Sequence, residues 1–134
     1  MAAFLSNQMN GVKKNELFLL LGTNNYGLSN QTKETFKTYY TNMLDAIIAL
    51  RPDIIIYCFS IFNRTNYVSG NSSGATGDDF AAAVSELCAT RSTTRYIYGK
   101  NFLSLANASD GIHPNQTGMQ QIKDSVLIAY NALQ

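Results

Sequence analysis

The stretch Leu17-Phe18-Leu19-Leu20-Leu21-Gly22-Thr23-Asn24-Asn25 decides the fold of this 134-residue chain. Residues 17–21 form a continuous apolar run, which is typical of a strand that is covered on both faces of a parallel sheet. A glycine follows at once, so we expect the strand to end in a tight turn. The sequence therefore predicts a buried strand that presents Asn24 at its carboxyl end.

Strands and helices alternate along the rest of the chain. Apolar side chains recur at helical spacing in residues 33–50, and the Arg51-Pro52 step ends that helix. Residues 54–59 are a second apolar run of strand length, and residues 96–98 predict a short third strand. This alternation implies right-handed crossovers and a parallel sheet, with functional residues at the carboxyl ends of the strands.

Two more helices and one long loop complete the predicted elements. Asp78 and Asp79 are suited to cap a helix that begins near residue 80. Pro114 fits the first position of the last helix, where its missing N–H costs nothing. The glycine-rich loop of residues 63–77 is too long for a simple connection. Two interpretations of it stay open: a loop that shapes substrate access, or a disordered surface excursion.

His113 is the only histidine in the chain, and it stands three residues after Asp110. An imidazole is an effective general base near neutral pH, and a carboxylate on its other nitrogen fixes the tautomer. The pair therefore predicts a catalytic base with its orienting carboxylate. The alternative is that Asp110 caps the last helix and that His113 is a surface residue.

Together these motifs resemble the SGNH/GDSL hydrolases, in which a strand ending in Gly-x-Asn-Asp precedes a distant Asp-x-x-His-Pro and a terminal helix. The resemblance implies a flavodoxin-like three-layer α/β/α fold with a parallel sheet. It also implies that Asn24 donates to the oxyanion, that His113 is the base and that Asp110 orients it. Gly22 and Thr23, in the same turn, are expected to contribute to the substrate site. Asn25 departs from the aspartate that is usual in the family.

The family's nucleophile segment has no counterpart in this sequence. Gly-Asp-Ser occurs nowhere, and only 21 residues precede Gly22. Residues 1–134 therefore resemble the back part of one domain whose N-terminal strands are absent, with residues 1–11 as the end of a preceding helix. We expect the serine to come from a missing N-terminal segment or a partner, and the chain alone to be inactive. Ser60 and Cys58 are weaker candidates, because neither lies in a strand-to-helix elbow.

The missing segment also predicts partners and substrates. Residues 17–21 would be an uncovered apolar edge, which favours binding of a complementary N-terminal fragment or self-association. Tyr26 and Tyr67 are expected to stack on a sugar ring, so a carbohydrate ester is the predicted substrate among small-molecule esters. Ester hydrolysis by this chemistry requires no metal or organic cofactor.

Composition excludes some partners and leaves one functional alternative. The net charge is +1 and charged residues are only 14% of the chain, so no electrostatic argument favours nucleic acid or an anionic membrane. The polar, weakly charged composition is typical of extracellular and phage-surface proteins. A non-catalytic carbohydrate-binding or structural module derived from the same fold remains the alternative. A flavodoxin-like ligand domain is disfavoured, because residues 22–27 match no phosphate-binding glycine pattern.

Overall fold

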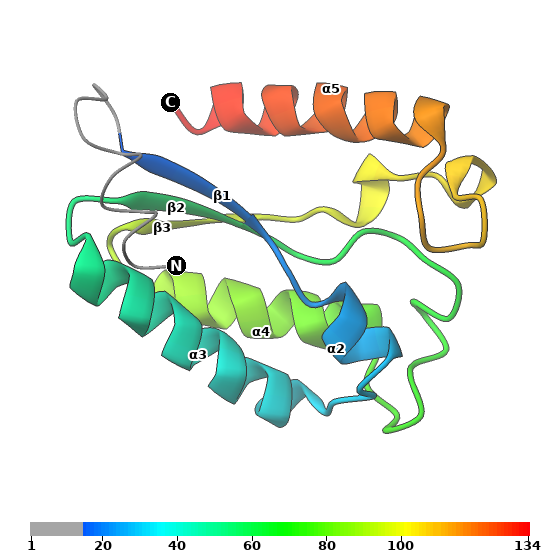
Figure 1. Ribbon diagram of the computed structural model, residues 1–134, viewed down its shortest axis with the longest axis horizontal. Coiled ribbons are helices and arrows are strands. Elements are labelled where there is room, and N and C mark those ends of the chain that lie inside the picture. Colours follow the sequence, from blue (N-terminus) through cyan, green and yellow to red (C-terminus); the bar gives the residue numbers. More distant parts are fainter. Residues whose placement is uncertain (1–14) are drawn as a thin grey trace.

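Three parallel strands form one sheet at the centre of the molecule (Figure 1). The computed structural model describes residues 15–134. Its strands, in the order in which they lie in the sheet, are β1 (Glu16–Leu20), β2 (Ile55–Phe59) and β3 (Thr94–Ile97). The predicted parallel α/β sheet is confirmed, and the strand bounds differ from the apolar runs by one or two residues, as is usual at element ends.

Helices cover the two faces of the sheet unequally (Figure 1). Two long helices, α3 (Lys33–Leu50) and α4 (Gly77–Ala89), pack on one face, and α5 (Gln116–Ala132) lies on the other. The short helical elements are α2 (Thr23–Gly27), η1 (Lys100–Phe102) and η2 (Leu105–Asn107). The described residues thus form the expected three layers of helix, sheet and helix. No helix within them is long and apolar enough to cross a membrane.

Strand side chains alternate between the two faces, as the period of two in a strand requires. Leu19, Ile56 and Cys58 belong to the core beneath α3 and α4. Phe18 and Tyr57 point to the opposite face, where their rings stack with centroids 5.0 Å apart. The apolar runs read from the sequence therefore supply two separate cores.

The start of α4 differs from the prediction. Thr76, rather than Asp78 or Asp79, is the N-cap: its hydroxyl accepts the backbone N–H of Asp79 at 3.1 Å. The Asp79 carboxylate accepts the backbone N–H of Thr76 in return at 2.8 Å, which completes a capping box. The prediction that the aspartates cap the helix is confirmed in part: Asp79 contributes from the third helical position, whereas Thr76 and neither aspartate occupies the N-cap.

The last helix also begins later than expected. It starts at Gln116, and the side chain of Asn115 caps it by accepting the backbone N–H of Gly118 at 2.9 Å. Pro114 lies before the cap, in an isolated bridge with Ala108. The prediction that Pro114 opens the helix is wrong, because the asparagine that follows is the stronger cap. The alternative that Asp110 caps this helix is wrong for the same reason.

The loop of residues 63–77 is held against the body of the protein by Asn71. Its side-chain amide donates to the carbonyl oxygens of Tyr26 at 3.1 Å and Gln31 at 3.0 Å, and its oxygen accepts the backbone N–H of Ala75. Asn71 is buried. The interpretation of this loop as a disordered excursion is therefore wrong, whereas its role in substrate access stays a prediction. The helix expected in residues 1–11 lies outside the described residues.

Candidate active site

The chain reverses at Gly22, directly after β1. Gly22 has a φ of +120°, and a Cβ placed on it would lie 3.0 Å from the side chain of Ile61. Both observations require glycine, so this buried residue serves the turn rather than offering a side chain to substrate. The residues that follow form α2 instead of a simple tight turn. Asn24 lies in its first turn and is exposed, and within residues 15–134 its side chain makes no hydrogen bond.

Asp110 and His113 form a hydrogen-bonded pair in the loop before α5. The Nδ1 atom of His113 lies 2.7 Å from Oδ2 of Asp110, while Oδ1 accepts the backbone N–H groups of His113 at 2.8 Å and Ile112 at 3.0 Å. The backbone N–H of His113, followed by its ring and the N–H of Ile112, holds the pKa of Asp110 well below its usual value. The carboxylate stays ionised at neutral pH, so Nδ1 carries the ring proton and Nε2 is free to accept one.

The loop that carries this pair is fixed to the segment after β2. The backbone N–H of Thr65 donates to the carbonyl oxygen of Gly111 at 2.8 Å. Gly111 has a φ of +77°, and a Cβ there would collide with the hydroxyl of Thr65. Asp110 and His113 are themselves exposed, with side chains 55% and 77% accessible. The pair is therefore held in place by the backbone around it and open to a reactant.

A cavity of about 270 Å³ lies beside the His113 ring. Thr23 from the Gly22 turn lines it together with residues 62–64, which follow β2, and residues 112–114, which precede α5. The structure therefore brings the predicted Gly22 turn and the predicted base to one cavity. Asn24 follows Thr23 directly but does not line the cavity in the described structure. Most of the wall is apolar, and its lining residues are Leu20, Thr23, Phe62, Asn63, Arg64, Ile112, His113, Pro114, Met119 and Ile122.

The two tyrosines predicted to stack on a sugar ring are buried instead. Tyr26 has no exposed surface, and its ring meets Phe80 edge-on with centroids 5.2 Å apart. Tyr67 is 1% exposed, and the Lys100 amine lies 4.6 Å from the centre of its ring. Both hydroxyls have partners: the carbonyl oxygen of Asn66 for Tyr26 and the Asp78 carboxylate for Tyr67. The predicted stacking role is wrong, because both rings are part of the packed interior.

The two alternative nucleophiles are also unavailable. Ser60 has no exposed surface, and its hydroxyl accepts the backbone N–H of Gly99 at 2.8 Å. Cys58 is buried as well, and contact with the Cys88 thiol together with burial raises the pKa of the Cys58 thiol. A nucleophile must be reachable and readily deprotonated. Within residues 15–134, no hydroxyl or thiol forms a hydrogen bond with the His113 ring.

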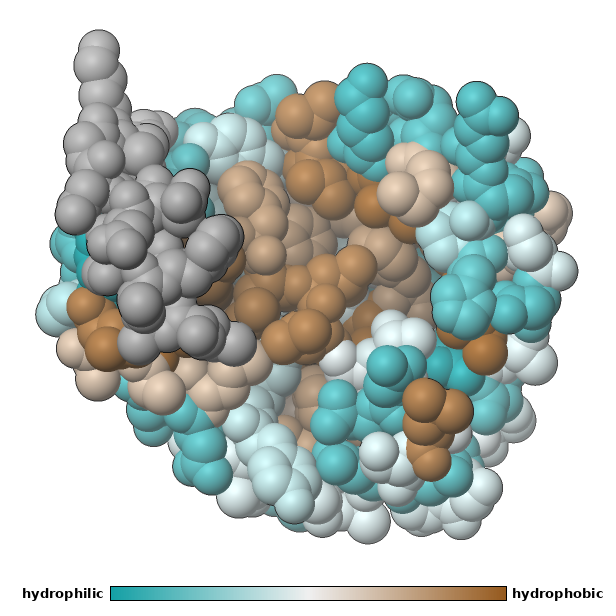
Figure 2. Space-filling view, in the orientation of Figure 1, coloured by the Kyte–Doolittle hydropathy of each residue, from teal (hydrophilic) through white to brown (hydrophobic). Residues whose placement is uncertain are grey.

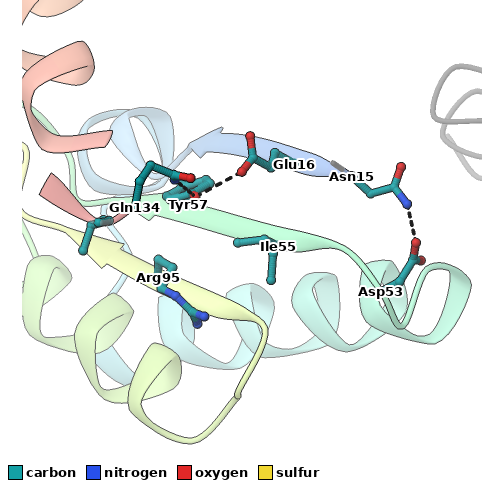
Figure 3. Close-up of a pocket in the computed structure, with 8 residues that line it drawn as sticks. Asn15, Glu16, Asp53, Ile55, Tyr57, Arg95 and Gln134 are labelled. Atoms are coloured by element: carbon teal, nitrogen blue, oxygen red, sulfur yellow. Dashed lines mark hydrogen bonds between the residues drawn. The ribbon is translucent and has the colours of Figure 1, made fainter. Parts of the chain in front are cut away.

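A second hollow lies at the opposite, amino end of the sheet (Figure 3). It is about 410 Å³ in volume and more polar, and Glu16 in its wall accepts hydrogen bonds from the hydroxyls of Tyr57 at 3.3 Å and Tyr130 at 2.8 Å. These bonds join β1, β2 and α5. Within residues 15–134, no group of three or more His, Cys, Asp or Glu side chains is placed to hold a metal ion.

Two residues that follow β2 also belong to the candidate site. Asn63 and Arg64 line the His113 cavity, although neither was predicted as a site residue. The signal was present, since both come shortly after the carboxyl end of an apolar strand, where parallel sheets collect functional residues. Arg64 is the more unusual of the two, because it is only 8% exposed.

Comparison with solved structures identifies the fold. An acetyl esterase, solved as a serine-to-alanine mutant with acetate ion, matches with a TM-score of 0.70 and 20% identity over 98% of this chain and 62% of its own. A salicylyl-acyltransferase from a tetracycline biosynthetic pathway matches with a TM-score of 0.73 and 15% identity over 99% of this chain and 41% of its own. The chain has the fold of the GDSL-like lipases and esterases.

A carbohydrate esterase from Talaromyces cellulolyticus shares this GDSL-like fold, with a TM-score of 0.64 and 19% identity over 98% of this chain and 66% of its own. In each of these three comparisons, the chain spans less than two thirds of the solved protein. No family model matches the sequence, and no curated protein matches it.

Proposed function

We propose that this chain is the part of an SGNH-type ester hydrolase that supplies the base, its orienting carboxylate and the oxyanion donor. The observation that carries the proposal is the Asp110–His113 pair, with Nδ1 and Oδ2 2.7 Å apart, beside a cavity that Thr23 also lines. Asn24 is the next residue after Thr23, and its exposed amide has no hydrogen bond within residues 15–134.

These residues support a two-step reaction once a serine hydroxyl is present. Nε2 of His113 takes the proton of the serine as its oxygen attacks the ester carbonyl carbon, and the Asn24 amide donates to the oxyanion. The imidazolium returns the proton to the leaving alcohol when the ester bond breaks. Water then attacks the acyl-serine by the same route, and the acid and the serine are released.

The serine is proposed to arrive on a strand that pairs with the free edge of β1. Within the described residues β1 pairs with β2 alone, and Phe18, Leu20 and Leu21 are each more than 40% exposed. Figure 2 shows that apolar side chains gather at the middle of this face. A parallel strand along β1 would end beside the Gly22 turn, at the same sheet edge as His113. Pairing of two copies through this edge is the alternative occupant.

The proposed substrate is a small uncharged ester. The cavity wall beside His113 is mostly apolar, so it suits an uncharged acyl group better than a charged group. A carbohydrate ester remains within this class, because a carbohydrate esterase shares the fold. The buried rings of Tyr26 and Tyr67 give no support to sugar stacking.

A non-catalytic carbohydrate-binding or structural module is the second candidate. The observation that favours it is the lack, within residues 15–134, of a hydroxyl or thiol bonded to the His113 ring. The two candidates differ in one respect: only the hydrolase gains turnover when a serine-bearing strand is added.

The test is a chimera in which the serine-bearing strand–helix segment of the acetyl esterase precedes the full chain. We expect hydrolysis of p-nitrophenyl acetate by the chimera and none by the chain alone. His113→Ala should lower kcat by about 10²–10⁴-fold, and Asn24→Ala by about 10²–10³-fold. Asn25→Ala is the matched control, because the Asn25 amide donates to Gln31 instead of facing solvent. A folded chimera without His113-dependent turnover would favour the non-catalytic module.

A further inference from the structure

Arg64 lies against the helix that carries Asn24. One of its terminal nitrogens, Nη1, donates to the carbonyl oxygen of Thr23 at 3.0 Å, and its guanidinium carbon lies 5.2 Å from the centre of the Tyr26 ring. A Cβ on Gly27 would meet Nη2 at 2.6 Å, so the guanidinium also lies close to the backbone at that position. The contacts of Arg64 thus fall on both sides of Asn24 in the sequence.

The burial of the Arg64 side chain is energetically unfavourable. This arginine is 8% exposed, its Nε atom is buried without a hydrogen-bond partner, and no carboxylate within residues 15–134 forms an ion pair with it. Arg51 and Arg91, by contrast, pair with Asp53 and Asp45. Burying a guanidinium without a counter-ion is unfavourable, so the stability of the fold alone does not explain its position.

The helix that Arg64 contacts, α2, has little intrinsic stability. α2 spans five residues, and Gly22 at its N-cap offers no side-chain cap. A helix this short gains too few internal hydrogen bonds to offset the entropy lost in ordering it. Its bonds run onward from Asn24 and Asn25, whose carbonyl oxygens accept the N–H groups of Leu28, Ser29 and Gln31. A cation at the Thr23 carbonyl and the Tyr26 face clamps this turn from outside.

We propose that Arg64 is a positioning residue, which fixes α2 and thereby aims the Asn24 amide at the oxyanion. This inference rests on the proposed function, in which Asn24 is the oxyanion donor. Arg64 also lines the His113 cavity, but the effect proposed for it on the reaction runs through Asn24. A small displacement of a preorganised donor lowers kcat strongly and changes the affinity for substrate little. The reason is that the donor's hydrogen bond is stronger in the transition state than in the bound substrate.

The first test uses the full chain without any added segment. Hydrogen exchange is measured for the amides of Tyr26, Leu28 and Gln31 in the wild type, Arg64→Met and Arg64→Lys. We expect roughly tenfold or faster exchange in Arg64→Met, since a hydrogen bond from a charged donor is lost. Arg64→Lys should recover part of the protection, because an amine still reaches a carbonyl oxygen. Unchanged exchange in Arg64→Met would overturn the proposal.

The matched control is Arg95→Met. Within residues 15–134, Arg95 likewise donates only to backbone carbonyl oxygens, those of Ser92 and Thr94, but it lies in the hollow at the other end of the sheet (Figure 3). Its loss should leave exchange in α2 unchanged. Amides of α3 and α4 report global stability, so faster exchange there and in α2 alike would mark a general loss of stability and count against a local clamp.

The second test is a double-mutant cycle in the active chimera. Arg64→Met should lower kcat about tenfold with little change in KM, and the effect should disappear when Asn24 is already alanine. An equal loss of kcat in both backgrounds would overturn the positioning role. Should the chimera be inactive, the proposed function fails, while hydrogen exchange still decides whether Arg64 clamps α2.

Discussion

The two faces of the sheet differ in how completely their apolar side chains are buried. On the α3 and α4 face, buried apolar side chains from both helices, from β1 and β2 and from the loop after β2 form one continuous core. On the α5 face, the buried residues are Tyr57, Phe59 and Ile97, and the neighbouring β1 edge leaves Phe18 and Leu20 exposed. The α3 and α4 face therefore holds most of the buried core, whereas the other face leaves apolar side chains exposed along β1, where we propose that a further strand packs.

Replacing one phenylalanine on each face should change the free energy of unfolding by very different amounts. Phe80 has no exposed surface and stacks on Phe36 with centroids 4.2 Å apart, so Phe80→Ala should lower the free energy of unfolding by about 3–5 kcal/mol. Phe18 is 44% exposed, so Phe18→Ala should cost about 1–2 kcal/mol. Urea unfolding measures both. Equal losses would show that the two faces contribute alike.

Removing Asn71 should test whether the long loop is part of the stable face. Asn71→Ala removes the donor to the Tyr26 carbonyl oxygen and one of the two donors to the Gln31 carbonyl oxygen, which also accepts the Ser73 hydroxyl. The loss should cost about 1–3 kcal/mol in urea unfolding. Ser72→Ala, at the neighbouring exposed position, is the control and should change little. A loss no larger than that of the control would mean that the loop adds nothing to stability.

A charge at the β1 edge should interrupt the exposed apolar surface there without unfolding the chain. Phe18→Lys removes the same ring as Phe18→Ala, so it should likewise lower the free energy of unfolding by about 1–2 kcal/mol. It should also reduce the fluorescence of a bound apolar dye, because it interrupts the exposed patch. Ile128→Lys is the control, since that side chain is 72% exposed on α5 and does not line the His113 cavity. Nor does it line the smaller cavity, about 120 Å³ in volume, whose wall includes Phe18 and Leu20. Equal dye loss in both variants would contradict a patch centred on β1.

The smallest expected effect is the acid titration of the His113 loop. The pKa of Asp110 is lower in the folded chain than in the unfolded chain, so its stabilising contribution is complete above the unfolded value of about 3.9. The contribution is lost as the pH falls from that value through the folded pKa. The stability difference between the wild type and Asp110→Asn should therefore be constant from pH 7 to about 4 and shrink below it. A difference that already falls between pH 7 and 5 would contradict this arrangement.

The sequence predicted the architecture well, because the signals for it are local. Continuous apolar runs predict buried strands, and the helical spacing in residues 33–50 predicted α3 with the bounds that the structure shows. The ends of elements were less predictable, since competing residues within three positions can all cap a helix. Thr76 prevailed over Asp78 and Asn115 over Pro114.

The candidate site could be predicted only in part. Gly22, Asp110 and His113 follow from motifs with fixed spacing, and the Asp110–His113 hydrogen bond needs just three residues of chain. Burial is a property of the whole fold, so the burial of Tyr26 and Tyr67 could not be predicted from their local sequence. Arg64 was not predicted for the same reason. It is distinguished only by its burial and by the lack of a carboxylate partner within residues 15–134, and neither can be inferred from the local sequence.

The most direct measurement is the intact mass of the chain and of the chimera after treatment with a serine-directed phosphonate. We expect no adduct on the chain alone and a single adduct on the added serine of the chimera, formed much more slowly in His113→Ala. An adduct on the chain alone would show that it already holds an activated nucleophile. Labelling of the chimera that does not depend on His113 would contradict the role of the Asp110–His113 pair.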